Sequence, residues 1–160
     1  MLSGSTALGV YATPRMTRDL DLVVQLDAGN VDTFVHAFSE DFYCDADAVR
    51  RSTLSRGIVN LIHTEHIVKV DIIVRKDTPY RRLEFERRRP VTIDGREMWV
   101  VSPEDLILSK LDWVKQGGSP IQMADVRELV SSVTDLDWGY LDQWAGELTV
   151  TTLLADARRA

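Results

Sequence analysis

The sequence contains a single cysteine, Cys44, so no disulfide can form within the chain. Low cysteine content is typical of proteins that fold in a reducing compartment, and we expect this one in the cytoplasm. No apolar run is long enough to cross a membrane. The opening residues Met-Leu-Ser-Gly have neither the basic region nor the apolar core of a secretion signal. We therefore expect no membrane partner.

Positive charge is in the minority, because 19 Lys and Arg residues face 25 Asp and Glu residues, for a net charge of −6. This balance argues against a surface built for non-specific nucleic-acid binding, so any such contact has to be local. Three scattered histidines and one cysteine do not make a zinc site. The P-loop, the Rossmann glycine pattern and the Gly-x-Ser-x-Gly elbow of serine hydrolases are all absent.

The stretch that carries chemistry begins at Gly4-Ser5 and continues to the pair Asp19 and Asp21. The two aspartates alternate with aliphatic residues, which is the period of a strand and places both carboxylates on one face. Such a pair repels itself unless a cation such as Mg²⁺ lies between the charges. A glycine lets the backbone approach a ligand, and a helix start attracts phosphate. The stretch therefore predicts an NTP·Mg²⁺ site, the alternative being a surface strand with two solvated aspartates.

This arrangement resembles the nucleotidyltransferase superfamily of the DNA polymerase beta type, whose signature is Gly-Ser or Gly-Gly, a spacer, and Asp-x-Asp. The resemblance implies an α+β fold with a mixed β-sheet, flanking helices and a small C-terminal helical part. We expect a catalytic core over residues 1–101 and the helical part over residues 102–160, packed together as one unit. In the family a strand ends at the Gly-Ser turn, and only residues 1–3 are available for it here.

The resemblance also implies an activity. We expect transfer of a nucleoside monophosphate from an NTP to an acceptor hydroxyl on RNA, protein or a small molecule, with release of pyrophosphate. The cofactor would be Mg²⁺ or Mn²⁺. The residues Pro14-Arg15-x-Thr17 before the aspartates are similar to the AbiEii-like, minimal nucleotidyltransferase branch, which includes toxins of toxin–antitoxin pairs. Two alternatives stay open: a toxin with a protein antitoxin as partner, and a degenerate, non-catalytic module that binds a nucleotide or a partner.

Three further residues enter through the resemblance. Asp71, a lone carboxylate in Val-Asp-Ile-Ile-Val, corresponds to the third metal ligand and general base; its alternative role is an ion pair with Lys69 on the same strand face. Lys110 follows Ser-Pro-Glu-Asp-Leu-Ile-x-x, and it either binds the triphosphate or extends from an apolar stripe to solvent. Asp125 would orient Lys110 or another active-site cation, although Gln122 stands where the branch often has a second acid. Arg15 is a further candidate for binding phosphate.

Periodicity and turn signals predict the remaining elements. An Asp-Gly pair at residues 94–95 predicts a hairpin, and a Ser-Pro pair followed by acids predicts a helix start at residue 102. The charge-dense residues 75–90 predict a solvated helix face or, alternatively, a basic lip for a polyanion. The aromatic residues after position 137 are expected in the core or an interface. Helices are expected over 6–12, 31–42, 46–54, 102–116, 121–133 and 137–159, and strands over 19–25, 57–63, 67–74, 90–93 and 97–101.

Overall fold

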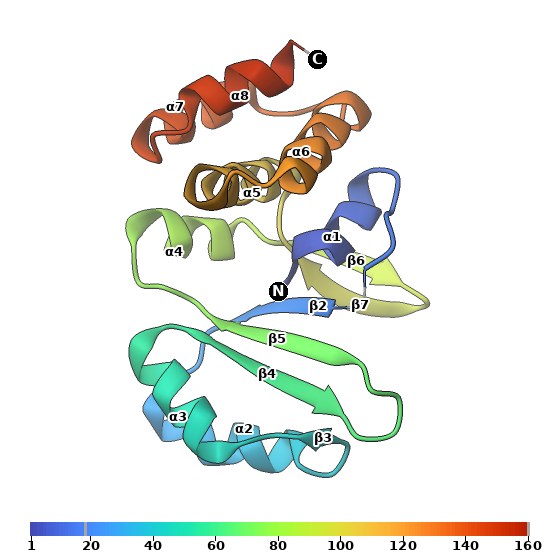
Figure 1. The fold of residues 1–160 in the computed structure, drawn as a ribbon, viewed down its shortest axis with the longest axis vertical. Coiled ribbons are helices and arrows are strands. Elements are labelled where there is room, and N and C mark those ends of the chain that lie inside the picture. Colours follow the sequence, from blue (N-terminus) through green and yellow to red (C-terminus); the bar gives the residue numbers. More distant parts are fainter. Residues whose placement is uncertain (18, 160) are drawn as a thin grey trace.

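The computed structural model describes residues 1–17 and 19–159, and this part of the chain forms a seven-stranded sheet with eight α-helices and one short 3-10 helix (Figure 1). The strands are β1 (Leu2–Ser3), β2 (Asp19–Val24), β3 (Phe42–Tyr43), β4 (Ile58–His63), β5 (Lys69–Val74), β6 (Arg89–Ile93) and β7 (Arg96–Val100). The helices are α1 (Gly4–Tyr11), η1 (Ala28–Asn30), α2 (Val31–Phe38), α3 (Ala46–Ser55), α4 (Pro79–Glu86), α5 (Pro103–Gly117), α6 (Pro120–Ser132), α7 (Trp138–Glu147) and α8 (Thr151–Arg158).

The sheet is mixed, with strand order β3-β4-β5-β2-β1-β7-β6. Strand β2 pairs in parallel with β5, β1 pairs in parallel with β7, and the other neighbours are antiparallel. The two-residue strand β1 therefore joins β2 and β5, the strands that carry the predicted aspartates, to the hairpin β6–β7. This arrangement confirms the expected α+β class with a mixed sheet and flanking helices.

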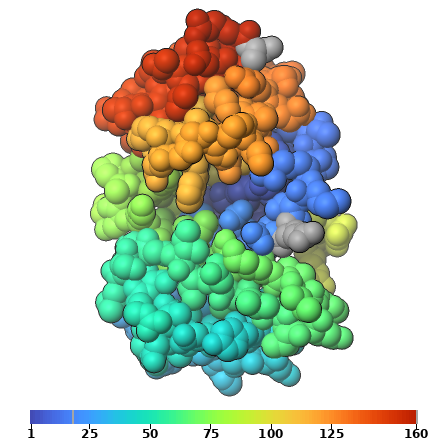
Figure 2. All heavy atoms as spheres, viewed as in Figure 1, coloured from blue at the N-terminus to red at the C-terminus, as the bar shows by residue number. Residues whose placement is uncertain are grey.

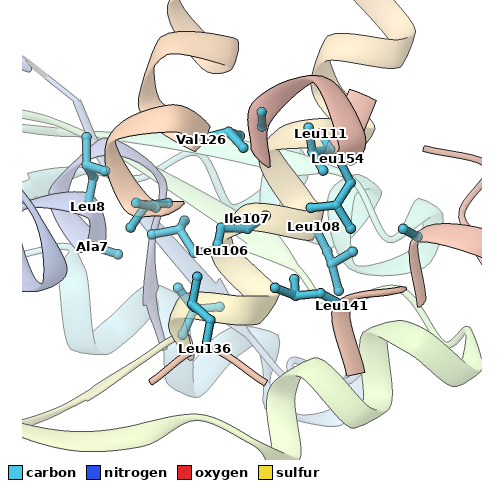
Figure 3. Close-up of a cluster of buried hydrophobic side chains, with 14 of the residues drawn as sticks. Ala7, Leu8, Leu106, Ile107, Leu108, Leu111, Val126, Leu136, Leu141 and Leu154 are labelled. Atoms are coloured by element: carbon cyan, nitrogen blue, oxygen red, sulfur yellow. The ribbon is translucent and has the colours of Figure 1, made fainter. Parts of the chain in front are cut away.

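Two hydrophobic clusters support the fold, and the helices divide between them (Figure 1). In the first, the helical core, α5 packs against α1, α6 and α7, and α8 packs against α6 and α7; Figure 3 shows side chains of this cluster. In the second, the strand core, α2 and α3 cover one face of β4 and β5. Leu20 and Leu22 of β2 pack against both clusters. Helix α5 and strand β2 are thus the elements around which the two halves assemble.

Local sequence explains the ends of several elements. The Ser102 hydroxyl accepts a hydrogen bond of 3.1 Å from the backbone N–H of Asp105, which caps α5 as expected. Gly118 ends the same helix in the left-handed conformation, with φ +63°. Asp94 and Gly95, with φ 49° and 75°, form the predicted hairpin turn between β6 and β7.

Two expectations are wrong. The helix predicted over 31–42 ends at Phe38, because Phe42 and Tyr43 pair with β4 as a short strand. The charged run 75–90 is not simply a solvated face: Glu84 is buried, and its two carboxylate oxygens each accept a 3.0 Å hydrogen bond from Arg81. Helix α4 packs beside α5, so these charges need partners where water is excluded.

None of the helices in the described residues combines the length and the apolar character that a bilayer crossing needs.

Candidate active site

The two strands that carry the aspartates lie side by side, and their register brings the carboxylates together. Strands β2 and β5 are parallel, with Asp21 directly opposite Asp71 and Asp19 directly opposite Lys69. Because side chains alternate along a strand, all four project from the same face, opposite the one that α2 and α3 cover. The Asn60 side chain, on the next strand β4, donates a 2.6 Å hydrogen bond to Asp71. The three predicted aspartates therefore share one small area of the sheet.

Asp21 is the most enclosed part of this area, and its environment disfavours the ionised form. Burial raises its pKa, and the neighbouring carboxylates of Asp71 and Asp19 raise it further, while Lys110 and Lys69 act in the opposite direction. A raised pKa means that negative charge here lacks full compensation. Oxygen ligands with uncompensated negative charge are what Mg²⁺ and Mn²⁺ bind, so the chemistry of these side chains fits such a cation.

The side chains nevertheless do not converge on one point. Within residues 1–17 and 19–159, no three His, Cys, Asp or Glu side chains lie close enough together to hold a metal ion. The Lys69 ammonium lies among them, 2.9 Å from Asp71 and 3.7 Å from Asp19. The metal site predicted from Asp19, Asp21 and Asp71 thus stays a prediction, and the ion pair considered for Asp71 is present.

Gly4 lies directly against this area. It adopts φ +61°, and a Cβ atom placed on it would lie 2.6 Å from Cγ of Asp21 and nearer still to its Oδ2. Only glycine fits such a position. The expected turn at Gly4-Ser5 is instead a direct junction between β1 and α1. The first backbone N–H groups of α1, which have no partners within the helix, therefore begin beside the carboxylates.

A cluster of opposite charges forms the other wall. The buried Lys110 ammonium contacts Asp125 at 2.7 Å and Gln122 at 3.0 Å. Arg15 contacts the second oxygen of Asp125 at 2.9 Å and also donates to the Ser5 hydroxyl. Lys110 and Asp125 are thus in direct contact, as an orienting role for Asp125 requires, and Lys110 does not extend to solvent. Arg15 and Ser5 join the same cluster.

Electrostatics within this cluster follow from burial and pairing. Burial lowers the pKa of Lys110, while Asp125 opposes that change. For Asp125, burial alone would raise the pKa, but hydrogen bonds from Arg15 and Lys110 bring it below its ordinary value. Two cations share one carboxylate, so the cluster carries a net positive charge. This charge is suited to binding an anion.

A cavity of about 240 Å³ joins the carboxylates to the cationic cluster. Figure 2 shows the hollow between α5 and α6, in orange, and the green strands β4 and β5. Its polar lining residues are Ser3, Gly4, Ser5, Asp21, Asp71, Ser109, Lys110 and Gln122, and its apolar lining residues are Ile58, Ile73, Leu106 and Trp113. Trp113 is 56% exposed although it is large and apolar, so a broad aromatic surface borders the cavity.

Sequence reasoning missed several residues of this site, among them Asn60 and Trp113. Asn60 contacts Asp71 because the register between β4 and β5 places them opposite each other. No pattern in the sequence predicts this register. Trp113, in contrast, had a usable signal: it lies three positions after Lys110 on one helix, and residues at that spacing share a helix face.

No protein-family model matches this chain, and no curated protein matches it either. Among solved structures, it is similar to an antigenic nucleotidyltransferase-like protein from Paracoccidioides brasiliensis, at 17% identity and a TM-score of 0.58, over 96% of this chain and 83% of the other. It is also similar to the lincosamide antibiotic adenylyltransferase LnuA in its lincomycin-bound form, at 14% identity and a TM-score of 0.52, over 82% of this chain and 85% of the other. These similarities establish the nucleotidyltransferase fold, and they do not single out the AbiEii-like branch.

Proposed function

We propose that the protein is a nucleotidyltransferase that transfers a nucleoside monophosphate from an NTP to an acceptor hydroxyl and releases pyrophosphate. The observation that carries this proposal is the cavity itself, which is lined by Asp21, Asp71, Lys110 and the start of α1 within a nucleotidyltransferase fold. A triphosphate needs cationic and N–H partners on one side and a metal-binding acid group on the other.

The polar lining residues of the cavity would hold the triphosphate. Lys110 supplies a buried ammonium, Ser5 a hydroxyl, and the first turn of α1, beginning at Gly4, supplies unpaired backbone N–H groups. Asp125 holds Lys110 in place through the 2.7 Å contact, and Arg15 can turn from Asp125 toward phosphate because it is 36% exposed.

The three strand aspartates would hold Mg²⁺ or Mn²⁺ and activate the acceptor. When bound, the cation supplies charge neutralisation at the phosphate oxygens. The acceptor oxygen forms a bond to the α-phosphorus while the bond from that phosphorus to the pyrophosphate oxygen breaks. Asp71 takes the hydroxyl proton, and Asn60 orients its carboxylate through the 2.6 Å hydrogen bond.

The apolar lining residues of the same cavity would hold the nucleoside. Trp113 offers an exposed aromatic face on α5, and Ile58 and Ile73 form an aliphatic floor on the strands β4 and β5. Any of the four bases can stack on an aromatic side chain. These apolar residues therefore explain how a base is bound, but they do not select one base over another.

For the acceptor, we favour a small hydroxylated molecule. One structural neighbour is an adenylyltransferase of a lincosamide antibiotic, with lincomycin bound. The net charge of −6 also disfavours a large polyanion. The toxin hypothesis assumes RNA or protein as acceptor and an antitoxin as partner. It depends only on the sequence motifs around Arg15 and Lys110.

The experiment is isothermal titration of each of the four NTPs as non-hydrolysable analogues, with and without Mg²⁺. We expect Mg²⁺-dependent binding to wild type that falls at least about a hundredfold in Asp21→Ala, since a metal ligand is lost. The matched control is Asp32→Ala, which removes an exposed aspartate of α2, beyond the opposite face of the sheet. Absence of NTP binding to wild type, or equal binding to Asp21→Ala, would contradict the proposed function.

A further inference from the structure

Lys69 occupies an unusual place for a lysine. Its ammonium contacts Asp71 at 2.9 Å and Asp19 at 3.7 Å, so it lies between two of the three carboxylates that would bind a divalent cation. The register of β2 and β5 imposes this position, because Lys69 is directly opposite Asp19 and two residues before Asp71 on the same strand face. The contact is therefore built into the sheet and does not depend on a loop.

Charge balance explains why the lysine is there. Three aspartates on one small area of two strands repel one another, and a single ammonium beside two of them reduces that repulsion. Lys110 and Arg15, the two cations of the other wall, are both committed to Asp125. Asn60 contributes a neutral donor to Asp71 but no charge. Lys69 is consequently the cation that compensates the Asp19–Asp71 side of the cluster among the described residues.

We propose that Lys69 is a built-in counter-cation of the aspartate cluster, which competes with the divalent metal and sets the metal concentration at which the site fills. This proposal rests on the metal site of the proposed function. An oxygen of Asp71 cannot give its full charge to Lys69 and to a metal ion together. A cation at the aspartates therefore has to displace the ammonium, and the Lys69 side chain, which is 40% exposed, can move it toward solvent.

The direction and size of the effect follow from this competition. Replacing Lys69 by methionine keeps the aliphatic stem and removes the charge, which leaves the carboxylates open to the metal. Two partly exposed ion pairs are lost, and pairs of this kind are individually weak. We therefore expect metal affinity to rise about tenfold in Lys69→Met, and to stay near the wild-type value in Lys69→Arg, which keeps the charge.

The test is titration of the nucleotide-free protein with Mn²⁺ alone, with free Mn²⁺ followed by its electron paramagnetic resonance signal. The matched control is Lys115→Met: Lys115 is 38% exposed and pairs with Asp112 at 3.1 Å, so an equivalent charge and ion pair are removed outside the aspartate cluster. Circular dichroism checks that each variant is folded, and Lys69→Gln replaces Lys69→Met if the latter is not.

The outcomes separate this proposal from the proposed function. Tighter Mn²⁺ binding in Lys69→Met, with Lys115→Met unchanged and Asp21→Ala weakened, supports both. Unchanged or weaker binding in Lys69→Met, while Asp21→Ala still loses affinity, overturns the counter-cation and leaves the metal site intact. If neither wild type nor Lys69→Met binds Mn²⁺, the metal site and the counter-cation are both wrong.

Discussion

The contact between Gly4 and Asp21 allows a prediction with an internal control. Gly4→Ala has two costs: the left-handed backbone at φ +61° and a Cβ atom placed 2.6 Å from Cγ of Asp21. The backbone cost is roughly 1–2 kcal/mol for a residue with a Cβ. The steric cost of forcing an extra carbon into a packed site is typically about 1–3 kcal/mol. We therefore expect Gly4→Ala to lower the free energy of unfolding by roughly 2–5 kcal/mol.

Gly118 separates the two costs. Its φ of +63° matches that of Gly4, but no heavy atom lies within 4 Å of a Cβ placed there. Gly118→Ala thus meets the backbone cost alone, roughly 1–2 kcal/mol. The assay is urea unfolding followed by tryptophan fluorescence, which four tryptophans make sensitive. We also expect Gly4→Ala, and not Gly118→Ala, to weaken Mg²⁺-dependent NTP binding, since Asp21 has to move.

A double-mutant cycle completes the argument. Asp21→Ala removes the two nearest atoms and leaves only the Asp21 Cβ, at 2.9 Å from the new Cβ of Gly4→Ala. In that background Gly4→Ala should cost at least about 1 kcal/mol less than in wild type. The reasoning is refuted if Gly4→Ala and Gly118→Ala destabilise equally, within about 0.5 kcal/mol.

Two further predictions concern the walls of the cavity. Trp113→Ala should weaken nucleotide binding about tenfold in calorimetry, through loss of stacking, while Trp99→Ala, another exposed tryptophan, leaves binding unchanged; equal effects would contradict the nucleoside assignment. Asp125→Asn tests whether the charge of Asp125 links stability to pH. Arg15 and Lys110 lower the pKa of Asp125 in the folded protein. The stability that the Asp125 carboxylate contributes is therefore present above the ordinary Asp pKa of 3.8, and it is lost as pH falls through the lowered pKa. Urea unfolding at pH 7 and near pH 3 should therefore show a larger gap between wild type and Asp125→Asn at pH 7, and a gap independent of pH would exclude this origin.

Much of the fold could be predicted because its elements carry local signals. Alternating polar and apolar residues predict β2 and β5, and the Asp94-Gly95 pair predicts a hairpin. Ser102 and the acidic residues after it predict the start of α5. Strand β1 has only two residues and no period, so its central place in the sheet depends entirely on pairing with β2 and β7. Nothing in the charge pattern of residues 75–90 indicated that Glu84 is buried against α5.

The candidate site also contains some residues that local sequence patterns predict and others that depend on long-range pairing. Asp19 and Asp21 follow from strand spacing, whereas the roles of Asp71, Lys110 and Asp125 required a family resemblance to suggest them. The contacts of Lys69 and Asn60 depend on the register between neighbouring strands, which is a long-range property. Sequence patterns identify which residues share a face, and only the assembled sheet shows which faces and residues meet.

The cavity lies where the helical core and the strand core meet, and this has a consequence for cooperativity. Leu106 belongs to the first cluster, while Ile58 and Ile73 lie on strands whose other face builds the second. A molecule held by both walls has to leave before either half can open away from the other. Bound nucleotide should therefore slow amide hydrogen exchange in β4 and β5 as well as in α5, so that two separately packed halves open as one unit.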